Sequence, residues 1–235
     1  MRIAVTQPYL FPYIAWYQVI DACDTFVIGD DFQYFKSGYI NRNHILLGGR
    51  PSPFVVPLRR ASRTALIGER EISGWHWAGR LLRSIATAYR RAPCFNEVYP
   101  LIEDIVSEPS PLLIDLLERA IVRTSRHLGL DRRIVRASRC HENRGLRGQE
   151  RILDIARAMG ADCYLQRETD AVRALYCHDL FAARGVELKF VRVGLLPYVQ
   201  RRVREFIQGL SLIDFLMFVP PEERGRHLRA YAIVD

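Results

Sequence analysis

The residues best suited to chemistry lie near the N-terminus. Asp30 and Asp31 stand side by side after residues 25–29, an apolar run with the composition of a buried strand. Two adjacent carboxylates at a strand end can hold a metal ion, orient an amine or remove a proton from it. Because side chains alternate along a strand, we expect at most one of the two to face a given pocket. In the alternative interpretation, one of them caps the following turn.

Lys36 follows these acids and is one of only two lysines in the chain, the other being Lys189. Arginine supplies nearly all of the positive charge, so a lysine here indicates a need for a compact ammonium or a tunable proton. We therefore expect the catalytic residues to be Asp30, Asp31 and Lys36, with one of them acting as general base toward an amine nucleophile.

A second group of polar side chains is suited to binding a substrate. Arg42 lies between Asn41 and Asn43, and its planar guanidinium fits a phosphate or a carboxylate. The two amides can bind sugar hydroxyls, or they can bond the backbone of local turns. Gln7 and Tyr9 flank a proline that fixes the backbone after an apolar run at residues 2–6. The expected substrate-binding residues are Gln7, Tyr9, Gln33, Asn41, Arg42 and Asn43.

These segments resemble the WbqC-like protein family. Its members typically begin His-Gln-Pro-Asn-Tyr-x-Pro-Trp-x-Gly and continue Asp-Asp-x-Gln-x-x-Lys-x-x-x-x-Asn-Arg-Asn. The residues that match the first motif are Gln7, Pro8, Tyr9 and Pro12, and those that match the second at the same spacing are Asp30, Asp31, Gln33, Lys36, Asn41, Arg42 and Asn43. Further similar segments extend as far as Leu210-Ser-Leu-Ile-Asp, so the resemblance covers most of the chain.

Two positions depart from the family pattern. The histidine that usually precedes Gln-Pro is Thr6 here, which removes a candidate general base. After Asp-x-Tyr-Leu the family tends to have a glycine-rich loop, whereas this chain has Gln166-Arg-Glu-Thr-Asp. A phosphate cradle of backbone amides would use glycines at that point. We therefore expect a specialised relative whose ligand contacts differ at both positions.

The resemblance implies a role in bacterial O-antigen or exopolysaccharide biosynthesis, or in a natural-product pathway. We expect a transferase that moves an acyl or aminoacyl group to an amino group of a sugar nucleotide or natural-product intermediate. Two alternatives remain open. One is a nucleotide-binding enzyme that forms adenylates or transfers nucleotidyl groups, and the other is a non-catalytic binding protein in a biosynthetic complex.

Strands and helices alternate along the chain, which predicts an α/β protein. If the strands at residues 2–6 and 25–29 pair in parallel, Gln7 and the two acids reach the same edge of the sheet, where ligands bind. We expect one domain over residues 1–235, with a mostly parallel Rossmann-like sheet flanked by helices and a helical insertion at residues 75–130. Other strands are expected at 54–58, 66–72, 134–137, 161–165 and 186–193, helices at 10–23, 75–90, 99–106, 111–127, 148–159, 176–184 and 206–218, and a mobile tail at 222–235.

The net charge of +8 suits an anionic small-molecule substrate or a tRNA, and it also fits a solvated basic surface. The basic run Arg201-Arg-Val-Arg has the same two interpretations, a phosphate-binding edge or a solvated face. No apolar run approaches the roughly 18 residues of a membrane span, and no secretion signal precedes the first strand. We expect a cytoplasmic protein, and nothing in the sequence indicates its oligomeric state.

The five cysteines are scattered, and they are expected to be reduced thiols. Cys140-His141-Glu142 brings metal-binding residue types together, but adjacent side chains point apart and no second cluster completes a zinc site. We therefore expect no metal and no tightly bound cofactor. An activated donor, such as an aminoacyl-tRNA, an acyl thioester or a nucleotide, is expected as co-substrate.

Overall fold

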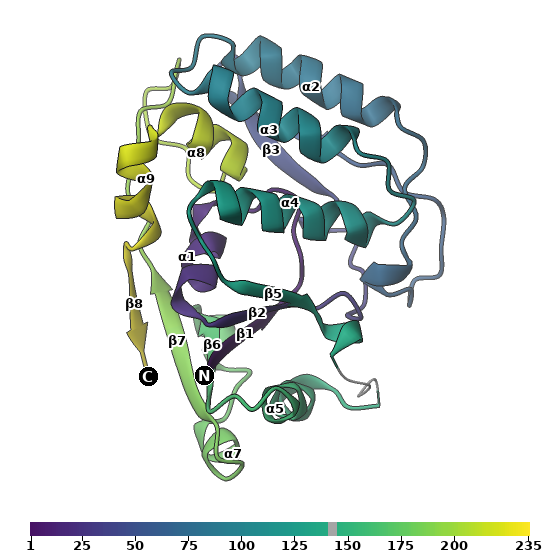
Figure 1. Ribbon diagram of the computed structural model, residues 1–235, viewed down its shortest axis with the longest axis vertical. Helices are drawn as coiled ribbons and strands as arrows, with labels where there is room; N and C mark the ends of the chain where they lie inside the picture. Colours follow the sequence, from purple (N-terminus) through teal and green to yellow (C-terminus); the bar gives the residue numbers. More distant parts are fainter. Residues whose placement is uncertain (141–144) are drawn as a thin grey trace.

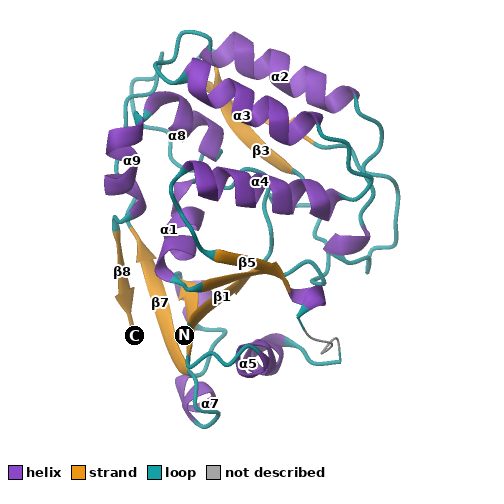
Figure 2. Ribbon diagram, in the orientation of Figure 1, coloured by secondary structure: helices purple, strands orange, loops and turns teal. Residues whose placement is uncertain are grey.

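The computed structural model describes residues 1–140 and 145–235. It contains a mostly parallel six-stranded sheet in the order β5-β2-β1-β6-β7-β8, with helices against both faces (Figures 1 and 2). The strands of this sheet are β1 (Arg2–Thr6), β2 (Thr25–Ile28), β5 (Arg133–Arg136), β6 (Cys163–Arg167), β7 (Glu187–Val193) and β8 (Tyr231–Val234). The first five are parallel, and β8 pairs antiparallel with β7. The predicted α/β class with a mostly parallel sheet is confirmed.

A separate hairpin is formed by β3 (Arg42–Leu47) and β4 (Arg50–Val55). The helices are α1 (Ile14–Ala22), α2 (His76–Tyr89), α3 (Phe95–Ser107), α4 (Leu113–His127), α5 (Gly148–Ala158), α6 (Asp170–Arg173), α7 (His178–Ala182), α8 (Leu212–Phe218) and α9 (Pro221–Leu228), with short 3-10 turns η1 (Ile67–Glu69) and η2 (Ala137–Arg139). Among the described residues, none of these helices has both the length and the apolar character needed to cross a membrane.

The predicted parallel pairing of β1 and β2 is confirmed, with Thr6 opposite Ile28. Side chains alternate across the sheet, so Ala4 belongs to the hydrophobic cluster that contains α1, whereas Ile3 belongs to the cluster that contains α5. The residues that follow both strands therefore emerge at one edge of the sheet.

The order of the sheet reverses between β1 and β6. From β1 the chain adds β2 and then β5 on one side, and afterwards it adds β6 and β7 on the other side. The connections that leave the ends of β1 and β6 therefore diverge, which opens a crevice at the carboxyl ends of these two strands. In doubly wound α/β proteins, this topological switch point is the usual ligand site.

Helices α2, α3 and α4 follow one another between β4 and β5 and lie together above the sheet in Figure 1. They fall within the range expected for a helical insertion, and the division of the chain into domains stays a prediction. The hydrophobic cluster on the α1 face of the sheet continues into all three helices. Tyr17 of α1 and Thr124 of α4 share a buried hydrogen bond of 2.6 Å between their hydroxyls, which ties α4 to α1.

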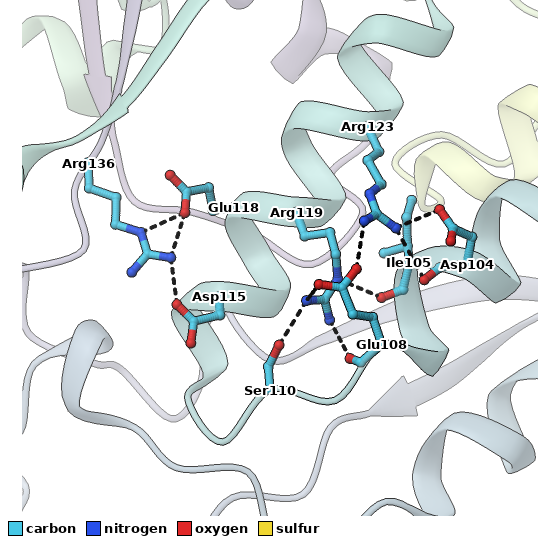
Figure 3. Close-up of polar contacts among 9 residues, drawn as sticks. All are labelled: Asp104, Ile105, Glu108, Ser110, Asp115, Glu118, Arg119, Arg123 and Arg136. Atoms are coloured by element: carbon cyan, nitrogen blue, oxygen red, sulfur yellow. Dashed lines mark hydrogen bonds and ion pairs between the residues drawn. The ribbon is translucent and has the colours of Figure 1, made fainter.

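Arginines hold α4 against α3 and against the end of β5. Arg119 of α4 donates to the carbonyls of Ile105 (2.9 Å) and Glu108 (2.7 Å) at the end of α3, where helical carbonyls lack partners within their own helix. Arg136 at the end of β5 pairs with Glu118 of α4 (Figure 3). Part of the arginine excess is therefore structural, with carboxylates and carbonyls as its partners.

The expected mobile tail at residues 222–235 was wrong. These residues form most of α9 and all of β8, which pairs with β7 so that Tyr231 lies opposite Val193. Gln18 of α1 donates to the carbonyl of His227 (2.7 Å), and Leu228 is buried. The few apolar residues of this segment are divided between a short helix and a short edge strand, so no long periodic pattern marks them.

Several element boundaries also differ from the predictions. Residues 66–72 contain η1 and isolated bridges instead of a strand. The strand expected at 54–58 is β4, whose prolines are tolerated because it pairs on one side only, with β3. The helix expected from residue 111 begins at Leu113, and the Ser110 hydroxyl accepts a hydrogen bond from Arg119. Helix α8 is shorter than expected, α3 is longer, and α6 was not predicted.

Candidate functional site

A cleft occupies the switch point at the carboxyl edge of β1 and β6. It consists of two adjoining cavities of about 640 and 690 Å³. The residues that line both cavities are Gln7, Phe32, Ile152, Leu175 and Tyr176. We refer to the combined space as the switch-point cleft. Its position follows from the order of the strands, because the cleft lies where the connections leaving β1 and β6 separate.

The end of β1 contributes Thr6 and Gln7 to this cleft. The Thr6 hydroxyl is buried and has no hydrogen-bond partner among the described residues. A buried hydroxyl without a partner costs free energy unless a water molecule or a ligand satisfies it. Thr6 occupies the position of the family histidine, so a small residue with a buried hydroxyl borders the cleft where the family usually has an imidazole.

The end of β6 contributes Gln166 and Arg167. The guanidinium of Arg167 donates a hydrogen bond to the hydroxyl of Tyr13 at the start of α1. Among the described residues, no carboxylate forms an ion pair with Arg167. The Gln166 amide donates to the hydroxyls of Tyr164 (3.0 Å) and Tyr176 (3.3 Å). The segment that lacks the family's glycines therefore carries a cation held against the side chain of Tyr13.

Asp31 lines the cleft from the turn after β2. Its side chain is only 2% exposed and forms an ion pair with Arg151 of α5. The Arg151 guanidinium also lies 5.1 Å from the centre of the Phe32 ring. A buried carboxylate needs such a partner because removal from water penalises its charge. The pair fixes the orientation of the Asp31 carboxylate at the wall of the cleft.

Asp30 points in a different direction. Its carboxylate accepts hydrogen bonds from the Ser138 backbone amide (3.0 Å) and from the Ser138 hydroxyl (2.5 Å). Its own carbonyl accepts from the Gly68 amide (2.6 Å). Asp30 thus ties the end of β2 to η2 and η1, whereas Asp31 belongs to the wall of the cleft with both carboxylate oxygens buried. The two acids diverge, as alternation along the chain leads us to expect.

Lys36 and Arg42 lie beside the cleft without lining either of its cavities. Lys36 is exposed in the loop between β2 and β3, and it directly follows Phe35, which does line the cleft. Arg42 donates from Nη2 to the carbonyl of Lys36 (2.7 Å), which fixes that loop. Lys36, expected to be catalytic, and Arg42, expected to bind substrate, therefore do not line the cleft together with Gln7 and Asp31, and their roles stay predictions.

The amides of Asn41 and Asn43 are buried and occupied by the protein itself. Asn41 donates to the carbonyl of Val56 (2.8 Å) and accepts from a tyrosine hydroxyl. Asn43 donates to the carbonyls of Leu10 and Phe11, both at 2.9 Å. These contacts are the structural interpretation that the sequence left open. Their role toward a substrate stays a prediction.

Gln33 and Tyr9 both line the cleft. Gln33 is exposed and donates to the carbonyl of Arg63 (3.0 Å). Tyr9 lies between Trp16 and Tyr39, with ring centres 5.7 and 6.2 Å away. Burial raises the pKa of the Tyr9 hydroxyl, so this group is a hydrogen-bonding phenol at neutral pH.

Exposed apolar side chains surround the mouth of the cleft. Phe35, Tyr39, Leu146 and Leu175 are among the most exposed large apolar residues of the described chain, and Leu175 is 66% exposed. All four line one of the two cavities. Apolar side chains collected around a cavity that holds a few polar groups are typical of a site that covers the ring or chain of a small molecule.

A sequence profile of the WbqC-like protein family matches residues 7–226, which include most of the residues that line the cleft. The chain belongs to the WbqC-like protein family. It is also similar to uncharacterized protein Rv1507c of Mycobacterium tuberculosis, with 28% identity over 135 residues. That match spans 57% of this chain and 58% of the relative. No solved structure matches the chain.

The sequence of this WbqC-like protein did not mark several residues that line the cleft. Arg151 lies in the middle of a helix and Tyr13 just before one, where both have the appearance of ordinary surface or core positions. Arg167 could have been found, because it belongs to the Gln166-Arg-Glu-Thr-Asp segment that departs from the family pattern. Arg151 and Tyr13 reach the cleft only through the packing of helices on the sheet.

Metal ligation has no support among residues 1–140 and 145–235, in which no group of three or more histidine, cysteine, aspartate or glutamate side chains could hold an ion. His141 and Glu142 of the Cys140-His141-Glu142 pattern lie outside the described residues.

Proposed function

We propose that this WbqC-like protein is a group-transfer enzyme that binds an anionic, ring-bearing substrate in the switch-point cleft. The observation that carries the proposal is the placement of a cation, Arg167, and a carboxylate, Asp31, on adjoining parts of one cleft with aromatic and apolar walls. The chemistry of these groups fits a sugar nucleotide or a natural-product intermediate with a phosphate or carboxylate group.

Arg167 is the group proposed to bind the anion. Its planar guanidinium can donate two parallel hydrogen bonds to a phosphate or carboxylate. It has an aromatic hydroxyl as partner in place of a carboxylate, so a ligand anion would not have to displace an ion pair. Tyr9, Trp16 and Tyr39 provide faces against which a sugar or base ring can pack.

Asp31 is the group proposed to act as general base, because it lines the cleft and Asp30 lines neither of its two cavities. In acyl or aminoacyl transfer, the substrate amine attacks the carbonyl carbon of the donor. A new carbon–nitrogen bond forms, the bond to the donor's leaving group breaks, and the amine loses a proton to the Asp31 carboxylate. Arg151 would hold that carboxylate in place during the reaction. Aminoacyl-tRNA, acyl thioesters and nucleotides are the donors to be considered.

Two other functions fit parts of the same site. The switch-point position is the one at which doubly wound proteins bind nucleotides, which favours nucleotidyl transfer. Thr6 in place of histidine and the loop without glycines count against that reaction. The use of Asn41 and Asn43 for internal contacts favours a binding protein without catalysis.

The test is mass spectrometry of the protein mixed with pooled amino sugars or sugar nucleotides and one donor class at a time. We expect a product whose mass has increased by an acyl or aminoacyl group, and we expect Asp31→Asn to abolish its formation. Asp179→Asn, at an exposed position on α7, is the matched control and should keep full turnover. Product formation that is equal in wild type and Asp31→Asn would contradict the assigned base.

A further inference from the structure

A second cavity, of about 390 Å³, lies beside the turn of the β3–β4 hairpin. Its wall carries Arg90 and Arg91 from the end of α2, and Arg201 and Arg202 from the loop before α8. We call this cavity the arginine pocket. It is distinct from the switch-point cleft, since β3 extends on the order of 17 Å from the cleft side to the hairpin turn.

The four guanidiniums of the pocket have no ion-pair partner among the described residues. One of them, Arg201, donates to the carbonyl of Arg91 (3.0 Å). Arg119 and Arg136 in the helical layer instead pair with nearby glutamates. Like charges gathered without carboxylates repel one another, and a bound anion would relieve that repulsion.

A buried polar cluster holds the two arginine-bearing segments in place. Asp214 of α8 is fully buried and accepts hydrogen bonds from the hydroxyls of Tyr89 (2.8 Å) and Tyr198 (2.7 Å) and from the Gln200 amide (3.0 Å). Tyr89 directly precedes Arg90, and Gln200 directly precedes Arg201. The pocket is therefore supported by fixed contacts from the protein interior.

The backbone at the pocket adopts conformations that favour glycine. Arg202 has a φ of +60°, a left-handed conformation that costs free energy in a residue with a side chain. At Gly49, whose φ is +81°, an added Cβ would lie 2.3 Å from the Arg202 carbonyl oxygen, so a larger residue cannot fit. The glycine turn and the arginine loop are thus packed directly together. Such strain is concentrated at ligand sites, where the surroundings maintain it.

We propose that the arginine pocket binds adjacent phosphate groups, either of a free oligophosphate or of a nucleic-acid backbone. Guanidiniums from two separate segments can each bind phosphate oxygens through paired hydrogen bonds. Phe218 is the aromatic side chain of the lining, and it is buried, so the pocket offers no exposed ring for stacking a base. Recognition here is therefore of phosphates, and it does not depend on the function proposed for the switch-point cleft.

The test is isothermal titration of the full chain with inorganic tripolyphosphate at low salt. Arg202→Gly removes one guanidinium and relieves the left-handed conformation, so it should keep or raise the melting temperature. Combined with Arg90→Gln, it should weaken tripolyphosphate binding by at least about tenfold, because hydrogen bonds to charged groups are among the stronger ones. Arg157→Gln, an exposed arginine of α5, is the control and should leave the affinity unchanged.

Equal affinity in wild type and the double variant would overturn the proposal, as would an equal loss in Arg157→Gln, which would indicate a diffuse charge effect. A second titration uses an RNA hairpin with tripolyphosphate as competitor. If tripolyphosphate displaces the hairpin from wild type and the double variant does not bind the hairpin, the source of the phosphates is a nucleic-acid backbone. Tripolyphosphate binding without hairpin binding identifies a free oligophosphate.

Discussion

Asn43 is the residue of the family motif whose structural role can be tested most sharply. Its side chain is 3% exposed and makes three hydrogen bonds to the backbone. Two of them hold the carbonyls of Leu10 and Phe11, and Phe11 has a φ of +46°. The Asn43→Ala substitution would remove the side-chain partner of the Leu10 carbonyl and of the His44 amide, leave the Phe11 carbonyl with the Leu212 amide alone, and release a strained turn.

The size of the effect follows from these contacts. Each buried polar group left without a partner costs about 1–3 kcal/mol, and water entering the released turn would satisfy some of them. We expect a loss of about 3 kcal/mol in the free energy of unfolding, which in a chain of this size lowers the melting temperature by about 6–12 °C. Denaturant unfolding and differential scanning calorimetry measure both quantities.

Asn96→Ala supplies the matched control, because Asn96 is exposed near the start of α3. It should change the free energy of unfolding by less than about 0.5 kcal/mol. If Asn43→Ala were as stable as Asn96→Ala and yet failed to bind substrate, Asn43 would be a ligand contact and the structural reasoning would be refuted.

Three further predictions concern other parts of the molecule. Lys36→Met should change the free energy of unfolding by less than about 0.5 kcal/mol, because Lys36 is exposed. If Lys36 has the catalytic role expected from the sequence, turnover should fall while the melting temperature stays unchanged. Full turnover in the variant would contradict that role. Deletion of residues 231–235 removes β8, the antiparallel partner of β7, and the 3.1 Å hydrogen bond from Tyr231 to Asp21. Calorimetry should therefore show a melting temperature several degrees lower. An unchanged melting temperature would show that this segment adds nothing to stability, as expected of a mobile tail. Burial lowers the pKa of His227 in the folded chain from its usual 6.5. Below pH 6.5 the unfolded chain therefore binds a proton at His227 more readily than the folded chain does. The contribution of neutral His227 to the free energy of unfolding is present above pH 6.5 and is lost as the pH falls toward the lowered pKa of the folded chain. Urea titrations of wild type and His227→Gln between pH 7.5 and 5 should show a smaller loss of stability in the variant, and parallel pH profiles would rule out this linkage.

The sequence was sufficient to predict those parts of the fold in which the local residue pattern and the order of elements along the chain indicate the same structure. The apolar runs of β1 and β2 and the helical spacing of α1 predicted a strand–helix–strand unit, and the parallel pairing that brings Gln7 and Asp31 to one edge followed from it. Alternation also indicated that Asp30 and Asp31 would separate. These features depend on interactions between residues close in sequence or on general rules of parallel sheets.

Tertiary packing decided the rest. Asn43 has the residue type of a sugar-binding amide, but the folded chain places the carbonyls of Leu10 and Phe11 against it. Arg151 is three positions into α5 and meets Asp31 only because α5 packs beneath the sheet. The motif therefore identified segments that border the switch-point cleft, but it could not distinguish the residues that line the cleft from those that hold its loops.

The most direct test of the account is the affinity of the switch-point cleft for an anion. A panel of nucleoside diphosphate sugars would be titrated into wild type, Arg167→Gln and the control Arg157→Gln. We expect at least one of them to bind wild type and the control equally, and to bind Arg167→Gln about tenfold or more weakly, as the loss of a charged hydrogen bond predicts. Equal affinity of all three proteins for every ligand that binds would contradict the claim that Arg167 and the switch-point cleft form the substrate site.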